Sequence, residues 1–322
     1  MYNLIIYDSR YGNTKKVVDI FQRIIGYSKA IRPEEFKLKY KENYDNFIFV
    51  SPVYIERLLP SVEKFIDENK EWLKEKKVYG CAINMVGERG LDYLNKMQKD
   101  LDGALVMKTS LYGEIRVKSL TKADYKGLKF FCENIGEKLG LQIPFGDLNL
   151  YDEKCVIEIA LEIKKQIEIR RKSLDKKLVE KIVYDFIKEK NTCVLATGYG
   201  DKQRGTPLEY ILYKEALYFI SEGGVKFANL YRNKNASVGI YNDFEGFNKL
   251  CGLQIEGELE EVKLRSEEYF KIMELRKISK KALDNLEVNL YMIKFNIKRI
   301  EAIHSKFKKY GGLPRQILEK KV

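Results

Sequence analysis

The chain has 322 residues, of which 45% are hydrophobic and 33% are charged. This length exceeds one compact core and predicts about two domains, and the composition excludes a disordered chain. The net charge of +12 arises from 59 basic and 47 acidic residues. Because the two signs are mixed along the chain, we interpret most of this charge as solvated surface and do not expect a nucleic-acid partner.

The length of the apolar runs and the first residues of the chain indicate where in the cell the protein is expected. No apolar run reaches the ~18 residues that a membrane-spanning helix needs. The chain begins with a predicted strand at residues 3–7 and not with a basic segment followed by an apolar one. We therefore expect a cytoplasmic protein without a membrane partner.

The cysteines and the histidine limit the chemistry of the side chains. Five cysteines are scattered and form no Cys-x-x-Cys pair, which disfavours zinc-ribbon and iron–sulfur sites. His304 is the only histidine, so a histidine-rich metal centre is not expected. No residue stands out as a general acid or base. We expect a bound cofactor, and not a metal site, to supply the chemistry.

The first 150 residues alternate runs of apolar residues with amphipathic segments. Val17, Val18 and Phe21 recur at helical spacing, for example, between the apolar run 3–7 and the run 47–50. Strands are predicted at 4–7, 47–50, 78–83 and 104–111, and helices at 14–25, 59–73, 91–97 and 125–139. This alternation predicts a parallel sheet with helices on both faces.

The pattern changes after residue 150. Two long charged helices are predicted at 154–171 and 175–190, with a linker at 170–174 between them. Strands follow at 192–197, 236–241 and 253–262, with a hairpin of 207–213 and 216–221 across Lys214 and Glu215, helices at 225–232 and 266–279, and late strands over 289–304. The pattern predicts domains at 1–172 and 173–322, the second of them a small β-barrel.

A loop between the first strand and the first helix has the composition of an anion site. It consists of Ser9, Arg10, Tyr11, Gly12, Asn13 and Thr14. The amino end of a helix offers unpaired N–H groups and a partial positive charge, and a glycine lets the backbone approach a phosphate. The segment contains neither the nucleoside-triphosphate loop nor the dinucleotide glycine fingerprint. An ordinary strand-to-helix turn with a capping Ser or Thr is the alternative.

Two further loops follow neighbouring strands. They are Ser51, Pro52, Val53 and Tyr54 after the strand ending at Val50, and Asn84, Met85, Val86 and Gly87 after the strand ending at Ile83. Ligands of open α/β sheets bind at the carboxyl ends of the strands, so the three loops are expected to meet at one site. Tyr54 is a candidate to stack on a flat ring, with an amphipathic surface tyrosine as the alternative.

These segments resemble a known family. The pattern Ser-x-x-Gly-Asn-Thr after the first strand, the stretch 44–54, the pair 59–60 and the stretch 65–73 are similar to flavodoxin domains of the menaquinone-dependent protoporphyrinogen oxidase type. The resemblance covers about residues 1–150 and implies that the three loops bind FMN. The sequence departs from the family in having no aromatic residue at 84–87.

A second candidate phosphate site lies at a later helix start. Ser221, the glycine pair at 223–224 and Lys226 place a hydroxyl, a flexible turn and an ammonium group close together. A glycine-containing turn with a solvated lysine is the alternative.

The order of segments in this half resembles the pyridoxamine 5′-phosphate oxidase-like split barrel, over about residues 190–300. Members of that family bind FMN, deazaflavin F420 or haem at a dimer interface. The resemblance implies phosphate contacts from Ser221 and Lys226, flavin contacts from Thr206, Pro207 and Leu208, a further contact from Asn229, and a homodimer formed through this domain. The arginine-rich phosphate set of true pyridoxamine phosphate oxidases is not evident, so oxidation of vitamin B6 is not expected.

The expected fold class is therefore α/β plus β, a flavodoxin-like parallel sheet followed by a split β-barrel. The expected function is that of an FMN-dependent oxidoreductase with one FMN per domain. Electrons from an unidentified donor would pass from the first domain through the second to a small-molecule substrate. One alternative is a haem- or porphyrin-directed protein with His304 as an axial ligand, and another is a flavin-binding module without catalytic activity.

Overall fold

A computed structural model describes residues 2–135, 143–170 and 173–320 of the chain. The chain divides into two units, Met1–Arg171 and Lys172–Val322, each with its own hydrophobic core. Among the described residues, no helix combines the length and the apolar character that crossing a bilayer would need.

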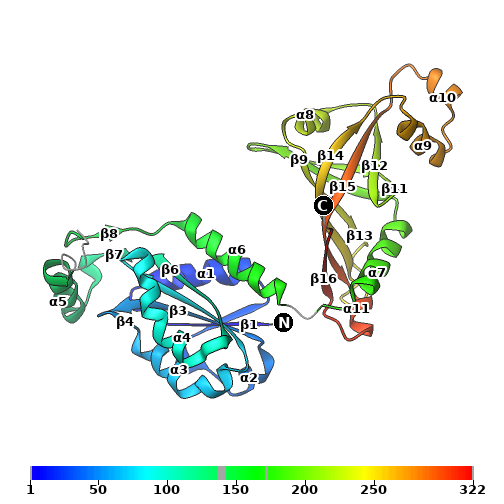
Figure 1. Ribbon diagram of the computed structural model, residues 1–322. Helices are drawn as coiled ribbons and strands as arrows, with labels where there is room; N and C mark the ends of the chain where they lie inside the picture. Colours follow the sequence, from blue (N-terminus) through cyan, green and yellow to red (C-terminus); the bar gives the residue numbers. More distant parts are fainter. Residues whose placement is uncertain (1, 136–142, 171–172, 321–322) are drawn as a thin grey trace. The chain divides into compact units, whose positions relative to one another are not determined.

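A six-stranded sheet forms the centre of the first unit (Figure 1). Five strands are parallel in the order β2–β1–β3–β5–β6, and β4 pairs antiparallel with β3. The strands are β1 (Asn3–Tyr7), β2 (Ser28–Ile31), β3 (Asn46–Tyr54), β4 (Arg57–Leu58), β5 (Lys77–Asn84) and β6 (Leu105–Tyr112). The strand order reverses at β1, so the loops that follow β1, β3 and β5 meet at one edge of the sheet.

Helices cover both faces of this sheet because successive strand residues point to opposite sides. Leu4 and Ile6 belong to one core, whereas Ile5 belongs to the other. The first core is covered by α2 (Lys39–Asn43), α3 (Pro60–Leu73) and α4 (Asn95–Leu101), and the second by α1 (Asn13–Ile25) and α6 (Glu153–Ile169). Near-continuous apolar strands buried on both faces are typical of a parallel sheet.

Beyond β6 the chain makes an excursion before it returns to α6. Two short strands, β7 (Glu114–Ile115) and β8 (Leu148–Asn149), pair antiparallel at its base. Between them lie α5 (Lys122–Phe130) and a π-helical turn over Phe131–Ile135. The helix predicted over 125–139 begins earlier than expected, at Lys122, because the side chain of Thr121 caps α5 there. The predicted residues 136–139 lie outside the described residues.

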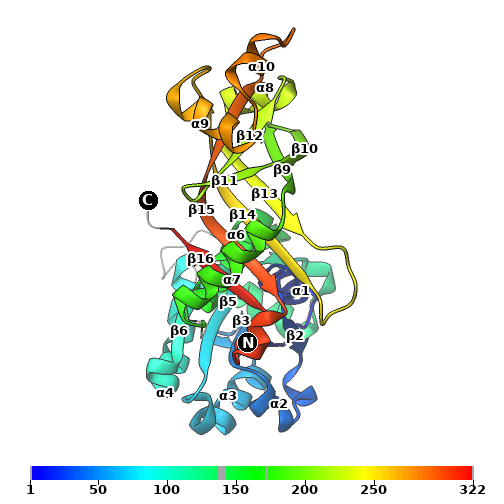
Figure 2. The same cartoon turned by 90° about the vertical axis from the view of Figure 1, so that its right-hand side faces the viewer.

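An eight-stranded antiparallel sheet forms the second unit (Figures 1 and 2). The order is β10–β9–β13–β14–β15–β12–β11, with β16 paired to β15. The strands are β9 (Thr192–Tyr199), β10 (Lys202–Glu209), β11 (Ile211–Tyr213), β12 (Ala216–Ser221), β13 (Asn235–Tyr241), β14 (Cys251–Val262), β15 (Tyr291–His304) and β16 (Arg315–Glu319). The expected fold class, α/β plus β, is confirmed.

Two cores hold the second unit together. Phe219 and Phe295 pack with Val183 and Phe186 of α7 in the main core. Tyr218 points to the other face of β12 and packs in a smaller cluster with residues of α9. The helices are α7 (Lys176–Glu189), α8 (Val225–Arg232), α9 (Glu267–Leu275), α10 (Lys280–Asp284) and α11 (Lys306–Lys309).

Several predicted elements of the second unit are wrong in detail. The predicted strand 207–213 is interrupted at Tyr210, whose side chain is buried and donates to the carbonyl oxygen of Ile187. Its first part belongs to β10 and pairs with β9, and only β11 forms the hairpin with β12. The predicted helix 266–279 is divided into α9 and α10, and the late strands over 289–304 form the single strand β15.

Several short elements were not predicted, among them α2, α11, β4, β7 and β8. The strands β2 and β16 were not predicted, because both are short. The predicted helix 91–97 is a 3₁₀ helix over Gly87–Leu94 followed by α4. A Cβ atom at Gly90 would lie 1.9 Å from Nδ2 of Asn84, so this segment approaches β5 more closely than the apolar spacing indicates.

A bulge in β14 depends on one glycine. The register between β14 and β15 shifts between Glu256 and Gly257. A Cβ atom at Gly257 would lie 2.2 Å from the carbonyl oxygen of Asn296. Gly239 on β13 has no atom within 4 Å of such a Cβ and serves as a matched control.

We expect Gly257→Ala to lower the free energy of unfolding of the second unit by about 1–3 kcal/mol, because the backbone must shift to admit the methyl group. Urea unfolding followed by far-UV circular dichroism measures this change. Trp72, the only tryptophan, lies in the first unit, so its fluorescence transition should not move. Equal unfolding midpoints for Gly257→Ala and Gly239→Ala would contradict the prediction.

Candidate functional site

A cavity of about 490 Å³ lies where β1, β3 and β5 end in the first unit. We call it the strand-end cavity. Its volume is in the range typical of small-molecule sites. Of the residues that the sequence predicts here, those that line the cavity are Ser9, Arg10, Tyr11, Gly12, Asn13, Thr14, Pro52, Val53, Tyr54, Asn84, Met85 and Val86. The structure therefore brings the three predicted loops together.

Ser51 and Gly87 do not line the strand-end cavity. The Ser51 hydroxyl donates to the carbonyl oxygen of Pro52 at 3.0 Å and accepts from the Leu59 N–H at 2.9 Å. The carbonyl oxygen of Gly87 accepts from Ser110 at 2.6 Å. Both residues shape the loops that carry the lining.

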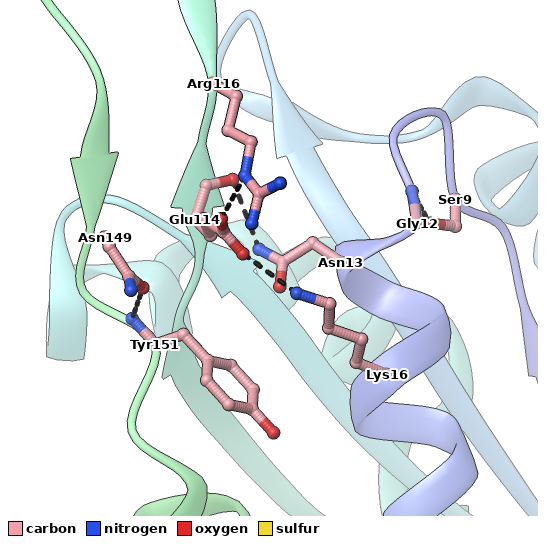
Figure 3. A network of polar contacts seen from close by, with 8 residues as sticks. All are labelled: Ser9, Gly12, Asn13, Lys16, Glu114, Arg116, Asn149 and Tyr151. Carbon is pink, nitrogen blue, oxygen red and sulfur yellow. Dashed lines mark hydrogen bonds and ion pairs between the residues drawn. The ribbon is translucent and has the colours of Figure 1, made fainter. Parts of the chain in front are cut away.

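The loop before α1 presents the amino end of that helix. Gly12 is the N-cap residue at a φ of 85°, a conformation that favours glycine, and no side chain of the described residues caps the helix. The Ser9 hydroxyl instead accepts from the Gly12 N–H at 3.0 Å and closes the loop (Figure 3). The first turn of α1 contains no acidic residue. An uncapped helix start without a nearby carboxylate of its own is suited to an anion.

Asp8, the carboxylate directly before this loop in the sequence, is turned to other partners. Asp8 accepts from the Ser9 N–H and from the Ser61 hydroxyl, each at 2.6 Å. Arg32 lies 3.5 Å from the same carboxylate. Asp8 is not part of the cavity lining, so it anchors the loop from behind.

One wall of the strand-end cavity carries two cations and one carboxylate (Figure 3). The Glu114 carboxylate accepts from Lys16 at 3.0 Å and from Arg116 at 2.5 Å. The hydrogen bonds from Lys16 and then from Arg116 hold the pKa of Glu114 below its usual value. Because Glu114 stays ionised, this wall carries one net positive charge.

Asn13 contributes an unpaired acceptor to the same wall. Its Nδ2 donates to the carbonyl oxygen of Glu114 at 3.3 Å, whereas its Oδ1 is buried and has no hydrogen-bond partner. A buried polar atom without a partner is uncommon in native structures. A ligand with a hydrogen-bond donor at this place would satisfy it.

Tyr54 provides a flat aromatic surface at the cavity. The Arg10 guanidinium carbon lies 4.9 Å from the centre of its ring, and the Tyr11 ring centre lies 6.4 Å away. Burial raises the pKa of Tyr54, so the phenol is neutral. Tyr93 also lines the cavity and adds an aromatic residue that the loop 84–87 lacks.

Sequence reasoning missed a whole wall of the cavity. It is formed by Leu120, Ala123, Asp124, Gly127, Leu128, Phe130 and Phe131 of the excursion after β6. Most of these positions lie at helical spacing and so mark one face of α5. The same spacing is typical of a helix that packs on a core, and the sequence does not distinguish the two cases.

The predicted residues of the second unit lie on β10, at the end of β12 and on α8. Thr206 has a buried hydroxyl without a partner. Pro207 and Leu208 continue β10. The Ser221 hydroxyl and the Lys226 ammonium group both hydrogen-bond at Gly223. Asn229 donates to the Thr197 hydroxyl at 3.0 Å, so its amide already has a protein partner.

Lys226 is 8% exposed and lacks a carboxylate partner among the described residues. Burial lowers its pKa, and the nearby charge of Arg204 acts in the same direction. The structure thus brings Ser221 and Lys226 together at the turn before α8, with Arg204 close to the lysine. These six predicted residues line neither the cavity of about 640 Å³ beside β9 nor the groove of about 1190 Å³ beside β11.

His304 is packed inside the second unit. Its side chain is 6% exposed, and its ring centre lies 5.8 Å from those of both Phe186 and Phe307. Nδ1 accepts from the Lys306 N–H at 3.1 Å, and burial lowers the pKa of the ring. The structure therefore does not present His304 at a surface where a haem would be ligated.

Residues 4–134 match the family model of a flavodoxin domain. The matched segment includes all three loops of the strand-end cavity and the whole of α5. We therefore call the first unit the flavodoxin-like unit. A search of curated proteins found no match to this chain.

Solved structures share a similarity with part of the chain. A pyridoxamine 5′-phosphate oxidase candidate from Listeria innocua is 21% identical, with 39% of this chain and 98% of that chain covered and a TM-score of 0.33. An FAD-binding protein from Mesorhizobium loti is 17% identical, with 38% and 90% covered and a TM-score of 0.32. The haem storage protein HutZ from Vibrio cholerae is 15% identical, with 37% and 89% covered and a TM-score of 0.32. At these TM-scores the similarities establish neither a ligand nor an activity for this chain.

Lys226 leads to a prediction about the pH dependence of stability. Folding lowers the pKa of Lys226 from its ordinary value of 10.5. Below the folded-state pKa the charged lysine therefore lowers the free energy of unfolding, and this cost disappears as the pH rises to 10.5. We expect Lys226→Met to unfold at a higher urea concentration than the wild type at pH 7, and this difference to shrink as the pH rises.

Far-UV circular dichroism over a series of pH values measures the effect. The exposed Lys234 gives a matched control, and Lys234→Met should show no such trend. A wild-type protein more stable than Lys226→Met at pH 7 would show that the buried ammonium group does not cost stability.

Proposed function

We propose that this chain is a cytoplasmic FMN-dependent oxidoreductase with one FMN site in each unit, the first of them of the menaquinone-dependent protoporphyrinogen oxidase type. We call the second unit, Lys172–Val322, the split-barrel unit. Electrons from a donor pass through the flavodoxin-like unit to the split-barrel unit and then to a small-molecule substrate. The observation that carries the proposal is the uncapped amino end of α1 at one side of a cavity lined by Tyr54 and Tyr93.

The phosphate of FMN fits the loop before α1. The first turn of α1 supplies N–H groups without a competing carboxylate, and Gly12 leaves open space where a Cβ would lie. The phosphate is an anion whose charge the helix start stabilises.

The ring of FMN fits the rest of the strand-end cavity. Tyr54 and Tyr93 supply aromatic surface, and the unpaired Oδ1 of Asn13 supplies an acceptor for a hydrogen-bond donor of the ligand near the start of α1. FMN contributes the redox chemistry, and the residues of this chain bind it, orient it and limit access of water.

The second FMN site is proposed at the turn before α8. Ser221 and Lys226 meet there, and Arg204 adds a second positive charge that an anion would balance. The buried hydroxyl of Thr206 is a further unpaired group on neighbouring β10. A homodimer through the split-barrel unit would supply the rest of the site from the partner copy.

Asn13→Asp tests the first site, because it places a carboxylate of the same shape at the first residue of α1. The added charge should repel a phosphate and weaken FMN binding by roughly 10- to 100-fold, whereas riboflavin, which has no phosphate, should be affected much less. Titration monitored by flavin fluorescence measures both affinities. The flavin released by heat should fall from about two FMN per wild-type chain to about one.

Asn95→Asp is the matched control, because Asn95 is exposed at the first residue of α4 and does not line the cavity. It should bind FMN as the wild type does. Wild-type protein that does not bind FMN, or equal FMN affinities of Asn13→Asp and wild type, would contradict the proposal.

A further inference from the structure

The wall of the strand-end cavity formed by α5 does not pack on either core of the flavodoxin-like unit. None of the apolar residues of α5 is buried, although the helix has one apolar face. That face, with Ala123, Gly127 and Leu128, lines the strand-end cavity and does not pack on a core. Figure 1 shows α5 at the end of the unit beside β7 and β8, away from α1, α3 and α4. The apolar face of α5 is therefore turned to the strand-end cavity.

The base of the excursion is fixed by a strand pairing and two contacts of side chains. β7 pairs with β8, and the Val117 N–H donates to the Asp147 carboxylate at 2.7 Å. Tyr125 also packs on Phe145 with ring centres 5.2 Å apart. These contacts tie both ends of the excursion to each other and leave the cavity-facing side of α5 to be held by other groups.

The cavity-facing side of α5 is held by Asp124, whose side chain is 9% exposed. Its carboxylate accepts from Arg10 at 2.9 and 3.1 Å and from the Tyr11 hydroxyl at 2.5 Å. The Tyr11 hydroxyl also accepts from the Thr121 N–H at 3.0 Å. Burial acts to raise the pKa of Asp124, but the hydrogen bonds from Tyr11 and Arg10 outweigh it and lower the pKa. Both partners of the Asp124 carboxylate, Arg10 and Tyr11, belong to the loop before α1.

We propose that α5 is a lid over the strand-end cavity and that Asp124 is the positioning residue that latches it to Arg10 and Tyr11. The latch joins the phosphate loop to the lid, so a ligand whose phosphate orders the loop also favours the closed lid. Opening requires the charge-assisted hydrogen bonds from Arg10 and Tyr11 to Asp124 to break, and it sets the rate at which the ligand leaves. The inference rests on the proposed function only in taking FMN as this ligand.

Asp124→Asn tests the latch, because it keeps the shape of the side chain and removes its charge. In the full-length chain without flavin, amide hydrogen exchange of residues 119–131 should be roughly tenfold faster than in the wild type, and that of β1 and β3 unchanged. With FMN bound, stopped-flow dissociation should also be roughly tenfold faster, and the association rate should change little.

Tyr11→Phe removes the other hydrogen bond of the latch. FMN should dissociate from the double variant Asp124→Asn/Tyr11→Phe no faster than from the faster of the two single variants, because both substitutions open the same contact. Glu133→Gln is the matched control. Glu133 pairs only with Lys129 among the contacts of the described residues, at 3.8 Å, and does not line the cavity. The Trp72 fluorescence transition shows that each variant is folded.

Unchanged exchange of residues 119–131 in both Asp124→Asn and Tyr11→Phe would overturn the lid, and so would unchanged FMN dissociation in folded protein. The exchange measurement needs no flavin. It therefore tests the lid proposal even if the wild type does not bind FMN. Absence of FMN binding would overturn the proposed function and not the lid proposal.

Discussion

The flavodoxin-like unit is organised around the uncapped amino end of α1. Ser9 uses its hydroxyl to close the loop through the Gly12 N–H and does not cap the helix, so the first N–H groups of α1 remain available. The left-handed conformation of Gly12 makes this geometry possible. Asp8, the nearby carboxylate, is held away by Ser61 and Arg32. Each of these features favours an anion at this place, and the cavity extends from it.

The strand order determines what else meets the anion site. Since β1 lies between β2 and β3, the loops after β1, β3 and β5 converge, and the excursion after β6 closes the remaining side. Glu114 pairs with two cations and so leaves one net positive charge, whereas Asp124 and Arg10 balance each other. The loop that attracts the anion is thereby connected to the helix that covers the cavity.

Much of this arrangement is predictable from sequence, because local rules decide it. Apolar periodicity predicts α1, α3 and the buried strands, and the residues Ser9–Thr14 predict the anion loop. The cavity face of α5 is not predictable in the same way, since a helix that faces a ligand has the spacing of one that faces a core. Ser51 and Gly87 belong to the predicted loops but do not line the cavity, because hydrogen bonds with Leu59 and Ser110 hold them, and these contacts between distant residues are not evident from the sequence. In the second unit the break at Tyr210 follows from a long-range hydrogen bond to Ile187.

The central claim is that the amino end of α1 binds the phosphate of a flavin. The most direct measurement is the ³¹P nuclear magnetic resonance spectrum of the chain loaded with FMN, recorded between about pH 5 and 8, where a free phosphate monoester titrates with a pKa of about 6. A phosphate held by the N–H groups and dipole of α1 should stay dianionic, so one bound resonance should keep its chemical shift over this range and be absent from Asn13→Asp. Bound FMN whose phosphate resonances all titrate like that of free FMN would contradict the account.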